Sequence, residues 1–130
     1  MKVYRWENAK GYGPYIDNNI SLGDTLRRRH HDTKYHPGPC QDGGLEHIYP
    51  TEVCGFRSLR QMHKWFSPDD IKLMMRYRYK LVVYDIDEED IRFGRKQVVF
   101  KKKEAKPVRE VKLRKVKPKE KKCSNQEKKS

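Results

Sequence analysis

Three polar residues stand at the ends of predicted sheet elements, where they could contact one ligand together. Arg5 lies in VYRW on the first strand, Ser58 follows GF in CGFRSL, and Gln97 opens the strand of GRKQVVF. Because chain ends of adjacent strands can converge on one cleft, a cation, a hydroxyl and an amide are candidates for a shared site. Each residue also has a simpler interpretation: Arg5 pairs with Glu7 or a loop carboxylate at the surface, Ser58 caps a helix, and Gln97 is an exposed strand residue.

Other chemistry finds less support in the residue pattern. Seven residues are of zinc-binding types, namely His30, His31, His36, Cys40, His47, Cys54 and His63. His36 and Cys40 have a plausible spacing for two ligands, but no CxxC or HxxxH motif supplies a second pair. The chain has no GxSxG elbow and no glycine-rich phosphate loop, and Cys54 lies in a predicted buried strand, where a thiol behaves as a small hydrophobe. The sequence therefore predicts no metal site.

The positive charge is concentrated at the C-terminal end. The formal charge is +13, and from Lys101 to Ser130 there are 14 Lys and Arg against 4 Asp and Glu, which leaves 17 against 14 for residues 1–100. Residues 101–130 contain no aromatic residue and few large aliphatic ones, too few to offset the entropy of ordering them. We therefore predict a globular domain over residues 1–103 and a disordered Lys-rich tail over 104–130.

A polybasic segment attracts polyanions by releasing their counterions, without sequence preference. Nucleic acid is thus the first partner to consider, and a solubilising tail is the alternative. The candidate contact residues are Lys101, Lys102, Lys103, Lys106, Arg109, Lys112, Arg114, Lys115 and Lys117.

Cysteine usage and hydropathy bear on the compartment. Three cysteines, an odd number, argue against a disulfide framework and favour a reducing compartment such as the cytoplasm. No apolar run approaches the ~18 residues of a membrane span, and the N-terminal residues lack the apolar segment of a signal peptide. We expect a soluble, unprocessed protein that does not contact membranes.

The elements that position these residues follow from the hydrophobic pattern. Predicted strands cover Lys2–Trp6, Val53–Phe56, Tyr79–Ile86, Ile91–Phe93 and Lys96–Lys102, and predicted helices cover Leu59–Phe66 and a segment from Pro68. Residues 7–51 form a long loop with four tyrosines and four of the five histidines, in which only Ser21–Arg29 could be a short helix. The prediction is a single small α+β domain, with a mixed sheet, two short helices on one face, and a long irregular N-terminal loop.

In this order, the segments VYRW, CGFRSLRQMHKWF and GRKQVVF resemble the three motifs of the mono-ADP-ribosyltransferase superfamily. Those motifs are an arginine on the first strand, a GF-x-S-T-S strand followed by a helix, and an E-x-E before an apolar strand. The resemblance implies NAD as the ligand, with Arg5 binding its phosphate and Ser58 positioning the ribose and nicotinamide. Gln97 falls where the catalytic glutamate stands.

The segments also depart from that pattern in ways that affect activity. Ser58-Leu59-Arg60 replaces S-T-S, and Gln97 is neutral. An amide keeps a hydrogen bond to a ribose hydroxyl but gives little stabilisation to the cation that forms as nicotinamide leaves, and losing such a partner commonly costs ~10²–10³ in rate. The resemblance thus implies binding of NAD or a related nucleotide, with weak or absent transferase activity.

The chain as a whole also resembles the small proteins that tailed phages encode. This gives an alternative function, a non-enzymatic protein that binds nucleic acid or a host nucleoprotein complex through its basic surface and tail. An inhibitor of a defence system, acting in the host cytoplasm, is one example. A virion or assembly protein without a ligand is a third interpretation.

Overall fold

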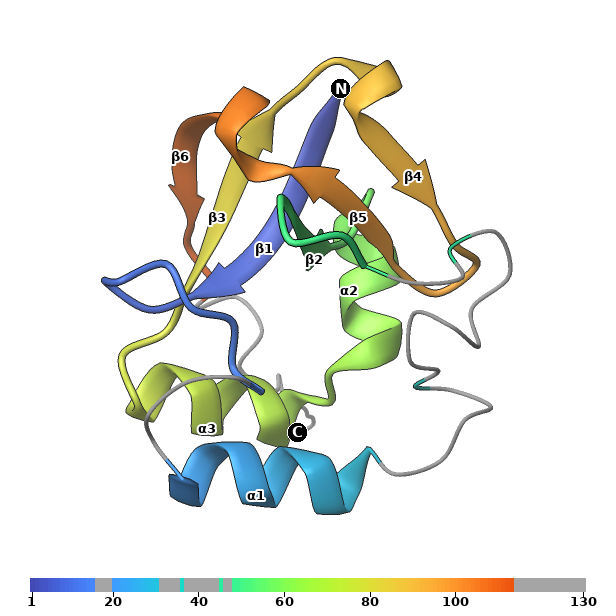
Figure 1. Ribbon diagram of the computed structural model, residues 1–130. Coiled ribbons are helices and arrows are strands. Elements are labelled where there is room, and N and C mark those ends of the chain that lie inside the picture. Colours follow the sequence, from blue (N-terminus) through green and yellow to red (C-terminus); the bar gives the residue numbers. More distant parts are fainter. Residues whose placement is uncertain (16–19, 31–35, 37–44, 46–47, 114–130) are drawn as a thin grey trace, which may run out of the picture.

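Strands and helices occupy different parts of the fold (Figure 1). The computed structural model describes residues 1–15, 20–30, 36, 45 and 48–113. Over these residues the strands lie together in one half, α1 and α3 lie side by side in the other, and α2 lies between them. The chain forms the predicted small α+β domain.

Two three-stranded antiparallel sheets make up the strand half. The first has the order β1 (Lys2–Glu7), β3 (Lys80–Asp85), β6 (Lys106–Val111), and the second has the order β2 (Glu52–Gly55), β5 (Val98–Lys101), β4 (Ile91–Phe93). A single bridge joins the sheets at β1 and β2, where the N–H groups of Tyr4 and Phe56 donate to each other's carbonyl oxygens at 2.7 and 2.8 Å. We expected one mixed sheet, so the pairing differs from the prediction.

Gly55 allows the two sheets to approach each other at this bridge. A Cβ atom there would lie 2.8 Å from Cγ1 of Val3 and 3.0 Å from the carbonyl oxygen of Tyr4. Real Cβ atoms essentially never come as close as 2.8 Å, and a contact of 3.0 Å is tighter than most, so a side chain at position 55 would force Val3 and the adjoining part of β1 to shift.

Three helices complete the described fold: α1 (Ile20–Arg29), α2 (Leu59–Trp65) and α3 (Pro68–Arg76). Ser58 caps α2 by accepting the Gln61 N–H at 3.0 Å, as its simpler interpretation predicted. Ser67 and Asp70 form a reciprocal capping box at the start of α3, with Pro68 in its first turn. The remaining regular segments are two 3-10 turns, Glu88–Asp90 and Lys102–Glu104.

Two clusters of buried side chains form the core. The larger packs α1, α2 and α3 against the sheets through Leu22, Leu26, Phe56, Met62, Phe66, Ile71, Met74 and Leu81, among others. The smaller packs side chains of both sheets together, namely Val3, Tyr84, Ile86, Ile91, Val98 and Phe100. Both clusters exclude water, and this burial of apolar area is the main term stabilising the fold.

The predicted start of the disordered tail is wrong. Residues 106–111 form β6, which pairs with β3 from Leu81–Val111 to Asp85–Lys106. An edge strand needs few apolar side chains, because backbone hydrogen bonds to its neighbour order it; Val111 and Leu113 also pack against the larger core cluster. Pro107 is tolerated because β6 is at the sheet edge and the register shifts opposite Val83 and Tyr84. Residues 114–130 lie outside the described residues.

Candidate ligand pocket

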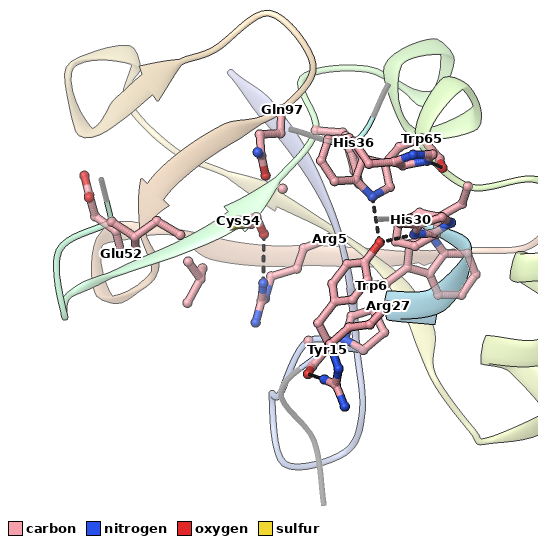
Figure 2. A pocket seen from close by; sticks show the side chains of 17 residues that line it. Arg5, Trp6, Tyr15, Arg27, His30, His36, Glu52, Cys54, Trp65 and Gln97 are labelled. Carbon is pink, nitrogen blue, oxygen red and sulfur yellow. Dashed lines mark hydrogen bonds between the residues drawn. The ribbon is translucent and has the colours of Figure 1, made fainter. Parts of the chain in front are cut away.

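One pocket of about 580 Å³ opens between the strands and the helices (Figure 2). Aromatic side chains dominate its lining, namely Trp6, Tyr15, Phe56, Trp65 and Phe66, with the imidazoles of His30 and His36. The polar groups on its wall include Arg5, Glu52, Cys54 and Gln97. Its volume lies within the ~300–1,000 Å³ typical of small-molecule sites, and its mixture of aromatic walls and few polar groups is also typical.

Arg5 is fixed on the pocket wall by partners from three segments. It is 7% exposed. One terminal nitrogen donates to the carbonyl oxygen of Cys54 at 2.8 Å, and the other donates to that of Gly11 at 3.2 Å. Its Nε lies 3.2 Å from a carboxylate oxygen of Glu7, so Arg5 does pair with Glu7, but the pair is largely buried and not at the surface as expected. Arg5 therefore both ties β1 to β2 and lines the pocket.

Glu7 balances a second cation beside Arg5. Lys102 Nζ lies 3.4 Å from Glu7 Oε1 and donates to the Gly11 carbonyl at 3.3 Å. The Tyr84 hydroxyl lies 2.8 and 2.9 Å from the two Glu7 oxygens. Burial and this hydrogen bond raise the pKa of Tyr84. Two cations thus share one carboxylate, and of these three groups Arg5 is the one that lines the pocket.

Cys54 and Gln97 extend the same wall. In the view of Figure 2, Cys54 lies between Arg5 and Gln97. Burial raises the pKa of the Cys54 thiol to about 11, despite the opposing influence of Arg5. Gln97 is 5% exposed, so its interpretation as an exposed strand residue is wrong. It immediately precedes β5, and its carbonyl accepts the Gly94 N–H at 2.9 Å, which closes the turn between β4 and β5.

A polar chain of side chains forms another part of the pocket. The Tyr15 hydroxyl accepts the indole N–H of Trp65 at 2.8 Å and makes a short hydrogen bond with Nδ1 of His30. Nε2 of His30 lies 2.8 Å from Oδ2 of Asp70. With an ionised Asp70 as acceptor, Nε2 of His30 carries a proton, and its Nδ1 faces the Tyr15 hydroxyl. Burial raises the pKa of Tyr15, so this hydroxyl stays protonated.

Asp70 anchors this chain in the ionised form. Burial alone raises the pKa of its carboxyl group, but hydrogen bonds from His30, from Arg29 at 2.7 Å and from the Ser67 N–H at 3.0 Å together lower the pKa below its ordinary value. His36 adds to the cluster because its ring stacks on that of His30, with centroids 4.0 Å apart. The sequence singled out His30 and His36 only as zinc-binding residue types. Their contacts with Tyr15 and Asp70 had no local signal, since Tyr15 and His36 lie in the long loop and His30 directly follows α1.

The sequence analysis also did not predict the ion pair between Glu52 and Arg92. Glu52 lines the pocket at the start of β2, and Arg92 on β4 donates to its two carboxylate oxygens at 2.9 and 2.6 Å. Arg92 is the main cause of the lowered pKa of Glu52. The pair joins β2 to β4 across the intervening β5, a contact between residues far apart in sequence that no local pattern indicates.

The three residues of the motif resemblance do not all reach the pocket. Arg5 and Gln97 line it, whereas Ser58 lines a separate groove along α2. The structure therefore brings two of the three predicted site residues together. Whether they bind NAD stays a prediction.

The predicted nucleic-acid contact residues fall into three groups. Lys101, Lys102 and Lys112 pair with Asp90, Glu7 and Glu110 at 3.7, 3.4 and 3.5 Å. Within the described ranges, the exposed residues Lys103, Lys106 and Arg109 have no ion-pair partner. Arg114, Lys115 and Lys117 lie outside the described residues.

Two further expectations concern metal ligands and membrane-spanning helices. His30, His36, Cys54 and His63 are described, and no group of three or more His, Cys, Asp or Glu side chains there could hold a metal ion. The other zinc-type residues weighed in the sequence, His31, Cys40 and His47, lie outside the described residues. No helix in the described part of the chain has the length and apolar character needed to cross a bilayer.

Comparison with known proteins identifies a family. A family model described as "Bacteriophage T4 Y00F protein" matches residues 1–114, which include every described strand and helix. No curated protein and no solved structure matches the chain. The match supports the expectation of a small phage-type protein, and it adds no evidence on ADP-ribosyl transfer or nucleic-acid binding. The chain belongs to the bacteriophage T4 Y00F protein family.

Proposed function

We propose that the protein binds a nucleotide-type ligand, NAD or a related nucleotide, in the pocket around Arg5, Cys54 and Gln97. One observation carries the proposal: Arg5 and Gln97, from opposite ends of the described chain, line one aromatic-rich pocket. A planar base or nicotinamide ring suits aromatic walls, since stacking on an aromatic side chain is worth roughly 1–3 kcal/mol per base.

The polar groups of the wall match the remaining parts of such a ligand. The Gln97 amide can both donate to and accept from a base edge or a carboxamide. The Arg5 guanidinium has five N–H donors, of which two reach the carbonyls of Cys54 and Gly11, and its positive charge favours a phosphate. The excess of positive charge left by Arg5 and Lys102 around Glu7 also favours an anionic ligand.

We propose that the protein binds this ligand and has weak or absent transferase activity. Gln97 cannot supply the negative charge that stabilises a developing ribosyl cation. Ser58 caps α2 and lies in another groove, so it does not complete the three-residue arrangement that the resemblance implies.

Tryptophan fluorescence tests the proposal, because the two tryptophans of the chain, Trp6 and Trp65, both line the pocket. Titration with NAD, nicotinamide mononucleotide and AMP, corrected for ligand absorbance, should change the emission saturably. Tyr15 also lines the pocket, so Tyr15→Phe should alter the affinity. Unchanged emission up to millimolar concentrations of all three compounds would exclude the proposed function.

A second candidate function is nucleic-acid binding through the C-terminal cations. The exposed, unpaired Lys103, Lys106 and Arg109 favour it. Truncation after Lys103 is not a clean test, because it removes β6 from the first sheet. Replacing Lys103, Lys106 and Arg109 by Gln keeps the strand and should weaken binding to an oligonucleotide if these residues carry it. Unchanged binding would exclude this surface.

A further inference from the structure

A second hollow, of about 660 Å³, lies along α2 and is distinct from the ligand pocket. Five of the residues that line it are cations, namely Arg57, Arg60, Lys64, Arg95 and Lys96. None of its lining residues, within the part of the chain that the structure describes, is Asp or Glu. We call this hollow the α2 groove. The charged residues described along its lining are thus all cations, whereas the lining of the ligand pocket includes the acidic Glu52.

Three of the cations lie along α2 and the residue before its cap. Arg60 and Lys64 are four positions apart in α2, which places their side chains on one face, and Arg57 comes just before the capping Ser58. All three are exposed, and none has an ion-pair partner among the described residues. Like charges four positions apart on a helix repel each other, so Arg60 and Lys64 weaken α2 slightly unless an anion lies against them.

The other side of the groove is held in place by Gln61. This side chain is 8% exposed. Its oxygen accepts the Arg57 N–H at 2.9 Å, and its nitrogen donates to the Arg95 carbonyl at 3.3 Å. Gln61 thus links the start of α2 to the turn between β4 and β5, which carries Arg95 and Lys96. The backbone positions of Arg57 and Arg95, one on each side of the groove, are therefore fixed by the fold.

We propose that the α2 groove binds the sugar–phosphate backbone of a single-stranded nucleic acid. Positively charged grooves that track the backbone are the usual means by which proteins hold single strands without sequence preference. A concave site suits a single strand, since a duplex is generally read by elements that protrude into its grooves. Arg57, Arg60 and Lys64, which have no ion-pair partner among the described residues, provide the charge complementarity.

The groove and the pocket can be tested separately. Lys96 lines the groove and Gln97 lines the pocket, so two consecutive residues serve the two sites. Trp65 borders both. This proposal does not depend on nucleotide binding in the pocket, because substitutions on the exposed face of α2 leave the residues that line the pocket unchanged.

The test is fluorescence anisotropy of a labelled oligothymidylate of about 16 nucleotides, measured over a salt series with the full chain. The groove variant is Arg60→Gln with Lys64→Gln. The control is Lys72→Gln with Arg76→Gln on α3, because these residues are also exposed, also four positions apart, and carry the same charge. Each lost phosphate contact lowers the slope of log K against log salt by about 0.7 for a single strand.

The groove variant should therefore have a slope shallower by about 1.4, which makes the affinity loss between 50 and 200 mM salt about sevenfold smaller. The control should keep the wild-type slope, and circular dichroism should show that both variants are folded. Equal effects of the two variants would show that the net charge of the protein determines binding, and would overturn the proposal that the groove does. Tighter binding of a duplex, equal competition by polyglutamate, or no binding at low salt would also overturn it.

Discussion

The guanidinium of Arg5 donates a hydrogen bond of 2.8 Å to the carbonyl oxygen of Cys54, and this bond connects the edge strands of two separate sheets. It lies beside the bridge between Tyr4 and Phe56 and forms part of the wall of the ligand pocket. The residue that best suits an anionic ligand is therefore also one that holds the two sheets together.

Arg5→Met should strongly destabilise the protein. The substitution leaves Glu7, whose side chain is 12% exposed, without its closest cation. It also leaves the Cys54 carbonyl oxygen without its Arg5 donor, and the Gly11 carbonyl oxygen with Lys102 as its remaining donor. Removing one partner of a buried ion pair costs about 3–5 kcal/mol. Urea unfolding measures this loss. Arg76→Met, at an exposed position, should change the unfolding free energy by no more than about 0.5 kcal/mol; similar values for both would show that Arg5 does not support the junction.

Gly55→Ala should weaken the contact between the sheets. The added methyl group would lie 2.8 Å from Val3 Cγ1 and 3.0 Å from the Tyr4 carbonyl oxygen. Such overpacking costs about 1–3 kcal/mol in thermal or urea unfolding. Gly23→Ala is the control, because its methyl group meets only the flexible Arg27 side chain and should stabilise α1 by up to about 1 kcal/mol. A neutral Gly55→Ala would contradict the close approach of β1 and β2.

Asp70 should make the free energy of unfolding depend on pH in the acid range. Its folded pKa is lower than its unfolded pKa, so its contribution is complete above the unfolded value, near 4, and is lost as pH falls towards the folded value. Asp70→Asn should be less stable at pH 7, by about 1.5–3 kcal/mol, and should lose less stability between pH 5 and 2. The matched control is Asp69→Asn, because Asp69 is an exposed neighbour. An unchanged acid transition in Asp70→Asn would disprove this role.

Cys54 should react slowly with alkylating reagents at neutral pH. Burial raises the pKa of its thiol to about 11, so the reactive thiolate is scarce. In a chain carrying Cys40→Ser and Cys123→Ser, the rate of alkylation by iodoacetamide should rise about tenfold per pH unit up to pH 10, well below that pKa. Mass spectrometry of quenched samples gives the rate. A plateau near pH 8 would show that the pKa of this thiol is not raised.

Much of the fold was predictable because local patterns determine it. Ser58 and Ser67 mark the starts of two helices through their capping residues, and the apolar run at 79–86 contains β3. Two features depended on pairing between distant segments. β6 has too few apolar residues to be recognised from its own sequence. The strands form two sheets that are joined by the single bridge between Tyr4 and Phe56, and no local pattern indicates this pairing.

The candidate site was predicted in part, for a similar reason. Strand ends indicated Arg5 and Gln97, which line one pocket, but helix capping explains Ser58 better than a ligand does. Tyr15 and His30 could not be identified from sequence, since a tyrosine in a loop and a histidine after a helix gain meaning only through their contact with Asp70.

Isothermal titration of NAD into the full chain tests the central claim most directly. The wild type should bind NAD, and Gln97→Leu should weaken the affinity roughly tenfold, because it removes an amide hydrogen bond worth about 1.4 kcal/mol to the ligand. Ser58→Ala should lower the stability of the protein by about 1 kcal/mol through loss of the α2 cap but leave the affinity unchanged. No binding heat at millimolar NAD, or equal affinity of wild type and Gln97→Leu, would contradict the account.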